Sequence, residues 1–192
     1  MTNCVNLADI DQAVNCADLD NVPGVAQEII YGYWEDVATW PKLPAPESDG
    51  LSLAQAGEWN GDIVMKTGTR AYKLVMTDDS GELTFTDQGE TGGESVLMEL
   101  SIHRAKISSV IFGFENATRG RRLFLIVKDK NGQCYLMGDQ NVAAKRVAAD
   151  ATTTGKASTD LNKVPMKFNY TCPRKLIYTG DVVNILTIAS GS

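Results

Sequence analysis

The strongest constraint on the fold is a series of short segments in which apolar and polar residues alternate. In residues 94–103, the even-numbered positions from Val96 to Ile102 are apolar, whereas Ser95, Glu99 and Ser101 are polar. Successive side chains of a strand point to opposite faces, so this alternation predicts a strand with one buried face. About nine short strands separated by turn residues are predicted: residues 25–34, 59–66, 70–77, 82–86, 94–103, 123–127, 133–138, 145–153 and 163–171.

One hairpin is marked by its turn residues. The segment Leu123–Val127 is apolar on both faces, which predicts a central strand covered from both sides. The dipeptide Asn131-Gly132 follows, and such a pair tolerates the positive φ angles of a tight hairpin turn. Residues 133–138 are therefore predicted to form the return strand.

A single segment has helical periodicity. Its apolar residues recur at i, i+3, i+4 and i+7, which predicts a helix over about residues 105–118 with one apolar stripe. Gly120 is suited to end this helix. Ser108, Ser109 and Gly113 are weak helix formers, so packing rather than propensity must hold it. The stripe consists of Ile107, Val110, Ile111 and Phe114.

These patterns predict a mainly β fold, an antiparallel β-sandwich or open barrel with one packed α-helix at about residues 105–118. Residues 25–192 are expected to form one domain, because no linker interrupts them and two apolar segments, 176–179 and 182–188, end the chain. Residues 1–24 are polar and close with turn chemistry, which predicts an N-terminal arm. Residues 41–57 are predicted to be a long loop.

The charge of the chain is distributed unevenly. The net charge is −6, but residues 1–102 hold 18 acidic and four basic residues, whereas residues 103–192 hold six acidic and 14 basic ones. Within the acidic half, residues 74–100 contain seven carboxylates and neither Lys nor Arg. A solvated surface explains such a run as well as a functional face does. The seven are Asp78, Asp79, Glu82, Asp87, Glu90, Glu94 and Glu99.

The composition argues against an enzyme. The one histidine, His103, is expected at a strand end, and the four cysteines contain no Cys-x-x-Cys pair, so neither a catalytic triad nor a zinc site is predicted. Free thiols are expected, although Cys4 and Cys16 could pair. We predict no catalytic, cofactor-binding or metal-binding residue and no cofactor. No segment approaches the roughly 18 apolar residues of a membrane span.

No nucleic-acid-binding patch is predicted either. Arg119, Arg121 and Arg122 follow the predicted helix, where cations complement the helix dipole. A nucleic-acid surface would need more basic residues interleaved with aromatic ones.

The order of several short motifs resembles small virion structural proteins of Bacteroidetes phages and prophages, in particular tail or tail-tube-like proteins. Most of the motifs lie in the second half of the chain, and three lie near its start. They are residues 123–132, 135–138, 154–162 and 166–170, together with 15–18, 23–25 and 29–31.

This resemblance implies a β-sandwich with a flanking helix, a long loop and mobile arms. It implies subunits that form rings, typically hexameric, which stack into a tube for DNA passage without sequence-specific binding. The partners would be the chain itself and other virion tail proteins, in the virion and, before assembly, in the host bacterial cytoplasm. The seven carboxylates would line the lumen, where they repel phosphate, or a subunit contact. The resemblance carries over no catalytic residue.

Two alternatives stay open. A head–tail connector or tail-completion protein is built on similar small β folds. A cell-surface β-sandwich module that binds glycan or protein belongs to a different class, and it would present an exposed aromatic platform. Trp34, Trp40 and Trp59 are the candidates for that platform, although burial in the core is the favoured interpretation of all three.

Overall fold

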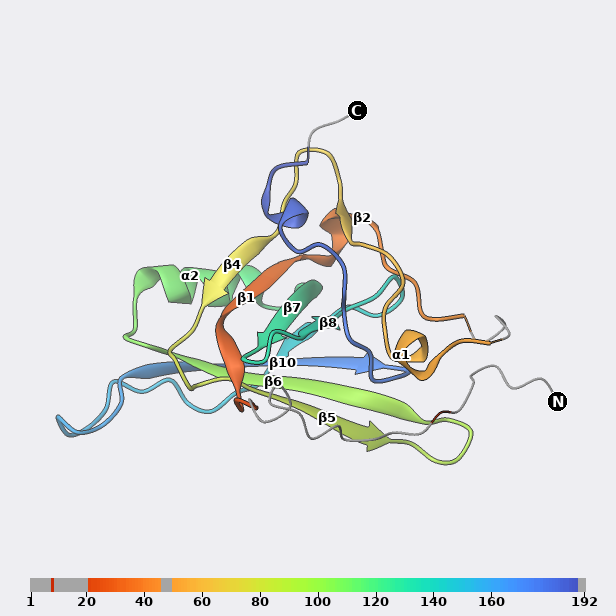
Figure 1. Cartoon of the computed structure of the whole chain (residues 1–192). Helices are drawn as coiled ribbons and strands as arrows, with labels where there is room; N and C mark the ends of the chain where they lie inside the picture. The colour runs from red at the N-terminus through yellow and green to blue at the C-terminus, as the bar shows by residue number, and fades with distance from the viewer. Residues whose placement is uncertain (1–7, 9–20, 46–49, 190–192) are drawn as a thin grey trace.

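A computed structural model of the chain describes Ala8, residues 21–45 and residues 50–189. Most of the predicted arm, residues 1–24, therefore lies outside the described residues. The fold is mainly β, as predicted, and consists of antiparallel sheets with few helices. Two four-stranded sheets stack on each other, and a smaller layer that contains a two-stranded sheet covers the first of them (Figure 1).

The middle layer, called here the central sheet, has the strand order β4-β1-β7-β8. Strand β7 is buried on both faces, as its apolar sequence predicts: Leu125 points into one core and Phe124 into the other, and neither is exposed. The predicted hairpin joins β7 to β8, and Gly132 in its turn has a φ of +95°. The bounds are β1 Val25–Tyr33, β4 Tyr72–Val75, β7 Leu123–Asp129 and β8 Cys134–Met137.

The second layer, called here the outer sheet, has the order β5-β6-β10-β9. Its long strands β6 and β10 pair from Lys163↔Ala105 to Cys172↔Val96, and alternate side chains of both are buried against the central sheet. Pro165 fits because β9 pairs only with positions 167–169 of β10, so no ladder bond is lost at residue 165. The bounds are β5 Glu82–Gln88, β6 Ser95–Ala105, β9 Lys145–Val147 and β10 Lys163–Cys172.

A third layer packs on the other face of the central sheet. It forms a second core in which Trp59, Tyr178 and Ile185 are buried against Phe124 and other residues of the central sheet. In Figure 1 most of this layer lies at the top and the outer sheet at the bottom, whereas the short helix α1 lies lower, on the right. Its elements are η1 Trp34–Asp36, β2 Val37–Thr39, α1 Leu53–Ala56, β3 Val64–Met65 and η2 Asn184–Leu186.

Three sequence predictions need correction, two of them in the third layer and one, the strand over residues 145–153, in the outer sheet. The predicted loop 41–57 contains the short helix α1, which begins with a capping box between Ser52 and Gln55. The strand predicted over 59–66 is reduced to β3, and the strand predicted over 145–153 to β9. The segment 182–188 adopts the turn η2 and contributes buried Ile185. Segments 59–66 and 182–188 are placed by packing of Trp59 and Ile185 in the second core, whereas β9 is placed by its pairing with β10.

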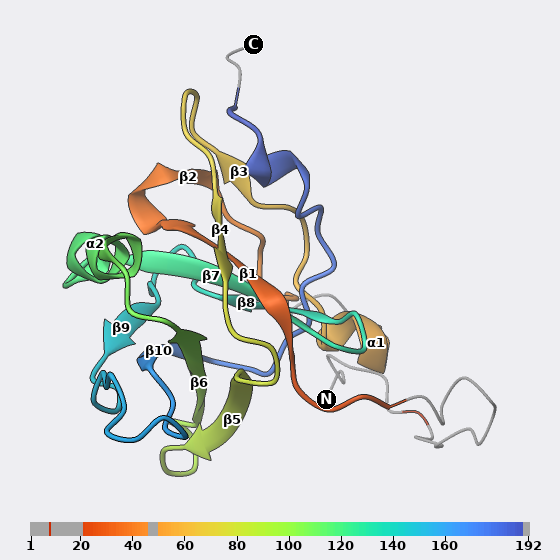
Figure 2. The same cartoon turned by 90° about the vertical axis from the view of Figure 1, so that its left-hand side faces the viewer.

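The long helix α2, Ser109–Thr118, begins later than the predicted residue 105. Strand β6 continues to Ala105, Lys106 turns the chain with a φ of +67°, and Ser108 caps the helix by accepting a hydrogen bond from the Ile111 N–H. The predicted apolar stripe is wrong for Val110, because that side chain is 74% exposed while Ile111 is buried. Helix α2 covers the side of the sandwich that ends in β9 (Figure 2).

Candidate functional site

The seven carboxylates singled out in the sequence all lie on the β5–β6 hairpin or in the turn before it. Asp78 and Asp79 occupy the turn, Glu90 and Glu94 the hairpin loop, and Asp87 the end of β5. Glu82 and Glu99 share the solvent-facing side of the outer sheet, because their strand neighbours Leu83 and Leu100 face the core. The carboxylates are therefore spread along the hairpin and do not gather in one patch.

Four of the seven carboxylates pair with lysines from the basic half of the chain. Lys130 contacts Asp78 and Asp79, Lys175 Nζ lies 2.6 Å from Asp87, and Lys167 pairs with Glu99. The hydrogen bond to Asp79 raises the pKa of Lys130. The charge split in the sequence is thus partly neutralised within the fold, because lysines of β10, of the β7–β8 turn and of the segment after β10 reach the β5–β6 hairpin. Among the described residues, Glu82, Glu90 and Glu94 have no ion-pair partner.

The two edges of the outer sheet differ in charge. One edge is β5, which pairs only with β6, and the other is β9, which pairs only with β10, as far as the described residues show. Strand β5 carries Glu82 and Asp87, whereas β9 carries Lys145 and Arg146. Asp87 and Arg146 are paired within the chain, with Lys175 and Glu115, so among the described residues Glu82 and Lys145 carry the uncompensated charge of the two edges. Natural proteins shield long edge strands with Lys, Pro or bulges. The seven-residue β5 has neither Lys nor Pro.

The solvent-facing side of the outer sheet is polar and almost neutral. Its charged side chains are Glu82 and Glu99 on the β5 half, against Lys145, Lys163 and Lys167 on the β9 half. The remainder are mainly hydroxyl and amide side chains. Leu97, Val147 and Pro165 are the partly exposed apolar side chains on this face, so its apolar area is small.

The two open sides of the sandwich also differ. On the β9 side, α2 closes the gap between the sheets. On the β5 side there is a cavity of about 430 Å³, called here the β5-side cavity. Phe85 and Tyr135 meet edge to face in it, with ring centroids 5.4 Å apart, and the Tyr135 hydroxyl donates to Asp129 Oδ2 over 3.1 Å. Its lining comprises Val22, Pro23, Gly24, Val25, Gly81, Glu82, Leu83, Phe85, Val127, Asp129, Asn131 and Tyr135.

Groups that could support catalysis are not brought together. His103 lies in a separate polar cavity of about 510 Å³ with Asp150 and Lys163, where burial and the Lys163 charge lower its pKa. Burial raises the pKa of Cys172 to about 11, so that thiol stays protonated at neutral pH. Cys4 and Cys16 lie outside the described residues. No group of three His, Cys, Asp or Glu residues suited to a metal occurs among the residues that the structure describes.

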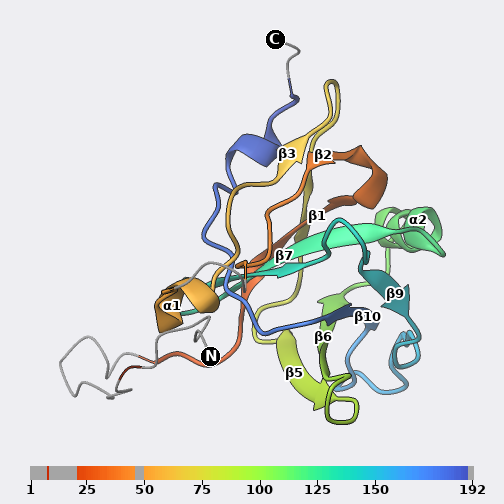
Figure 3. The same cartoon turned by 90° about the vertical axis from the view of Figure 1, so that its right-hand side faces the viewer.

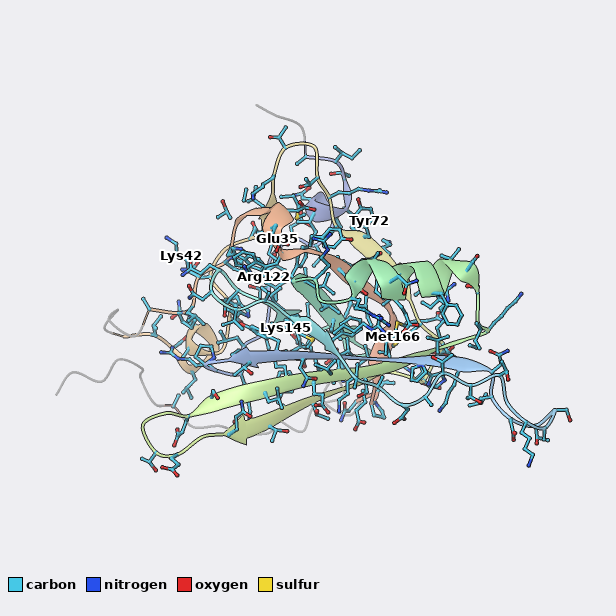
Figure 4. All side chains as sticks on the ribbon, turned by 180° about the vertical axis from the view of Figure 1, so that it is seen from behind. Glu35, Lys42, Tyr72, Arg122, Lys145 and Met166 are labelled. Atoms are coloured by element: carbon cyan, nitrogen blue, oxygen red, sulfur yellow. The ribbon has the colours of Figure 1, made fainter. Side chains whose placement is uncertain are left out.

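The three tryptophans do not form an open platform. Trp59 is buried, and Trp34 and Trp40 are half-buried with ring centroids 5.9 Å apart. The Arg122 guanidinium lies over the Trp34 ring at 3.6 Å, and the indole N–H of Trp34 donates to the Asp139 carbonyl oxygen. Figure 4 shows Arg122 beside Glu35 in this region. The arginine therefore covers the indole face that a sugar ring would need.

The candidate site thus consists of the two edges of the outer sheet and the β5-side cavity. Sequence reasoning predicted neither of them. Strand order decides which strands are edges, and no local pattern records that order. No protein-family model, curated protein or solved structure matches the chain. Among the described residues, no helix is long and apolar enough to cross a membrane.

Proposed function

We propose that the chain is a self-assembling structural subunit whose copies join head to tail through strands β5 and β9, and that it serves as a tail-tube-like subunit of a phage virion. The observation that carries the proposal is the pair of free, oppositely charged edges of the outer sheet. The virion assignment rests in addition on the resemblance of the sequence motifs to tail proteins.

Edge pairing would supply the backbone hydrogen bonds that β5 lacks on its free side. The contact is heterologous, because two different edges meet, and repetition of a heterologous contact generates closed rings or helical stacks. Acidic β5 against basic β9 favours head-to-tail contact over contact between two copies of β5.

Ring closure would place one face of the outer sheet toward a central channel. The solvent-facing side of that sheet suits such a lining, because it is hydrated and Glu99 already neutralises Lys167. Phosphate groups are held by uncompensated cations. Lys145 and Lys163 have no ion-pair partner among the described residues, but Glu82 offsets one of these two charges. The face would therefore hold phosphate only weakly, and Glu90 and Glu94 at the hairpin loop add repulsion.

A head–tail connector or tail-completion protein would use the same edge contact in a single ring. The particle formed distinguishes the two: a tube subunit stacks, whereas a connector stops at one ring. The glycan-binding alternative has less support, because Arg122 covers the Trp34 face.

The first experiment measures size and morphology at rising protein concentration, by light scattering and negative-stain electron microscopy. We expect concentration-dependent growth into rings or tubes, and weaker growth in high salt because charge complementarity is screened. A chain that remains monomeric at every concentration and salt would contradict the proposal.

The second experiment places lysines on the free edge. The double substitution of Thr84 and Thr86 to Lys should abolish assembly, because both positions are exposed on β5 and would face basic β9 of the next copy. Thr152→Lys is the matched control, since Thr152 is exposed and lies outside the strands. Glu82→Lys and Lys145→Glu should each weaken assembly severalfold, and their combination should restore it.

A further inference from the structure

We infer that helix α2 of one copy fills the β5-side cavity of the next copy, with Phe112 as the inserted side chain. This inference rests on the proposed head-to-tail assembly and adds a second contact to it. It explains two features that the isolated fold leaves without a role: the exposed ring of Phe112 on α2, and an open, partly apolar cavity at the opposite side of the sandwich.

The inserted part is a well-anchored surface. Helix α2 has ten residues, and its buried Ile111 packs into the core between the sheets. Phe112 is 41% exposed on one flank of the helix, whereas Val110, which is 74% exposed, lies two positions away on the opposite flank. The helix is tied to the β9 edge, because Arg146 Nη2 of β9 lies 2.7 Å from Glu115 Oε1 and Nη1 donates to the Glu115 carbonyl oxygen. The outer side of α2 and the β9 edge therefore form one rigid surface.

The receiving cavity has a complementary character. Leu83, Phe85 and Val127 provide apolar walls, and Glu82 and Asp129 lie at the polar part of the lining. The partly buried Leu83 and Phe85 belong to β5, so the cavity is continuous with the edge that is proposed to pair. Lys106, exposed just before α2, carries the charge opposite to that of the two cavity carboxylates.

Moving one copy beside the next along the strand order of the outer sheet would form both contacts, the β9–β5 pairing and the insertion of α2. Figures 2 and 3 show α2 and β9 on one side of the molecule and β5 on the other. Figure 4 looks onto the first of these sides, with Lys145 of β9 between the level of α2 and that of β10. When β9 of one copy approaches β5 of the next, the α2 that accompanies β9 approaches the cavity that opens beside β5. A second copy of the chain is therefore the occupant that fits.

The direct test is a photo-cross-linking residue, p-benzoylphenylalanine, in place of Phe112 in the full-length chain. Irradiation under assembling conditions should yield intermolecular cross-links that mass spectrometry maps to residues 81–85 and 127–135. The same residue at Val183, which is 65% exposed and lies far from α2 in sequence, is the control and should not mark the cavity. Cross-links from position 112 to other regions only would overturn the inference.

A variant keeps the inference falsifiable by a second measurement. Phe112→Ser should lower the apparent association constant about tenfold and leave folding intact, because Phe112 lies outside the core; Val183→Ser should have no effect. Unchanged association of Phe112→Ser would overturn the inference while assembly through the edges stands. A cross-linker at Leu83 that captures residues 1–20 of the same chain would likewise replace α2 as the occupant. A chain that never assembles would overturn both proposals.

Discussion

The central and outer sheets have the same number of strands but differ in how many of their faces are covered. The central sheet is covered on both faces, so its strand β7 is apolar at successive positions from Leu123 to Val127. The outer sheet is covered on one face, so β6 and β10 alternate between buried and partly exposed positions. The central sheet is therefore mainly structural, whereas the outer sheet leaves one face and two edge strands accessible to a partner.

This difference predicts unequal costs for the same substitution. Phe124→Ala removes a ring that is fully buried in the second core, and we expect it to lower the free energy of unfolding by about 3–5 kcal/mol. Phe85→Ala in the edge strand β5 should cost clearly less, because that ring is partly exposed beside the cavity. Urea denaturation of the two variants measures the contrast. Equal losses would show that the β5 edge is as tightly packed as the central sheet.

Two glycine substitutions compare a tightly packed position, beside Phe124 in the central sheet, with an open position on α2. A Cβ added at Gly32 of β1 would lie 2.5 Å from the Phe124 ring, so Gly32→Ala should destabilise the fold by about 1–3 kcal/mol. Gly113→Ala places its methyl group on α2 with nothing within 4 Å, and the gain in helix propensity should stabilise the fold by about 0.5–1 kcal/mol. Thermal unfolding should therefore shift in opposite directions.

The contrast between the sheets also explains how much could be predicted. Burial on one face produced the alternation of β6, and burial on both faces produced the apolar run of β7, so both strands were predicted correctly. Helix α2 was predicted four residues too early, because Ile107 continues the helical spacing although Lys106 breaks the backbone. Val110 fits the stripe in sequence but faces solvent.

The candidate site could be predicted only in part. The seven carboxylates were found, but the lysines that neutralise them come from β10, the β7–β8 turn and the segment after β10, at long sequence separation. Asp139 gave no signal, because an aspartate after a glycine is typical of a turn. Strand order, which makes β5 and β9 the edges, is a property of the whole fold.

Asp139 joins the two sheets, and a hydroxyl deletion tests that link. Its Oδ1 accepts from the N–H groups of Asn141 and Val142, and its Oδ2 accepts from the Tyr170 hydroxyl over 2.6 Å. Tyr170→Phe leaves a buried carboxylate oxygen without this donor, and we expect a loss of about 1–3 kcal/mol. Tyr135→Phe is the control, because its hydroxyl bond to Asp129 is half exposed and should matter less. If Tyr170→Phe left the free energy of unfolding unchanged, apolar packing alone would hold the two sheets together.

The smallest expected effect concerns pH on the free face of the outer sheet. Burial and the Lys163 charge lower the pKa of His103, so the folded state binds the proton less readily than the unfolded state does. His103 therefore costs no stability above the ordinary histidine pKa of about 6.5, and it lowers the free energy of unfolding as the pH falls below that value. Wild type should therefore lose slightly more stability than His103→Gln between pH 7.5 and 5. Because carboxylate titration is common to both chains, the difference isolates His103. A larger loss in the variant would show that the protonated imidazole gains a stabilising partner in the folded state. Protonation of His103 would then stabilise the fold.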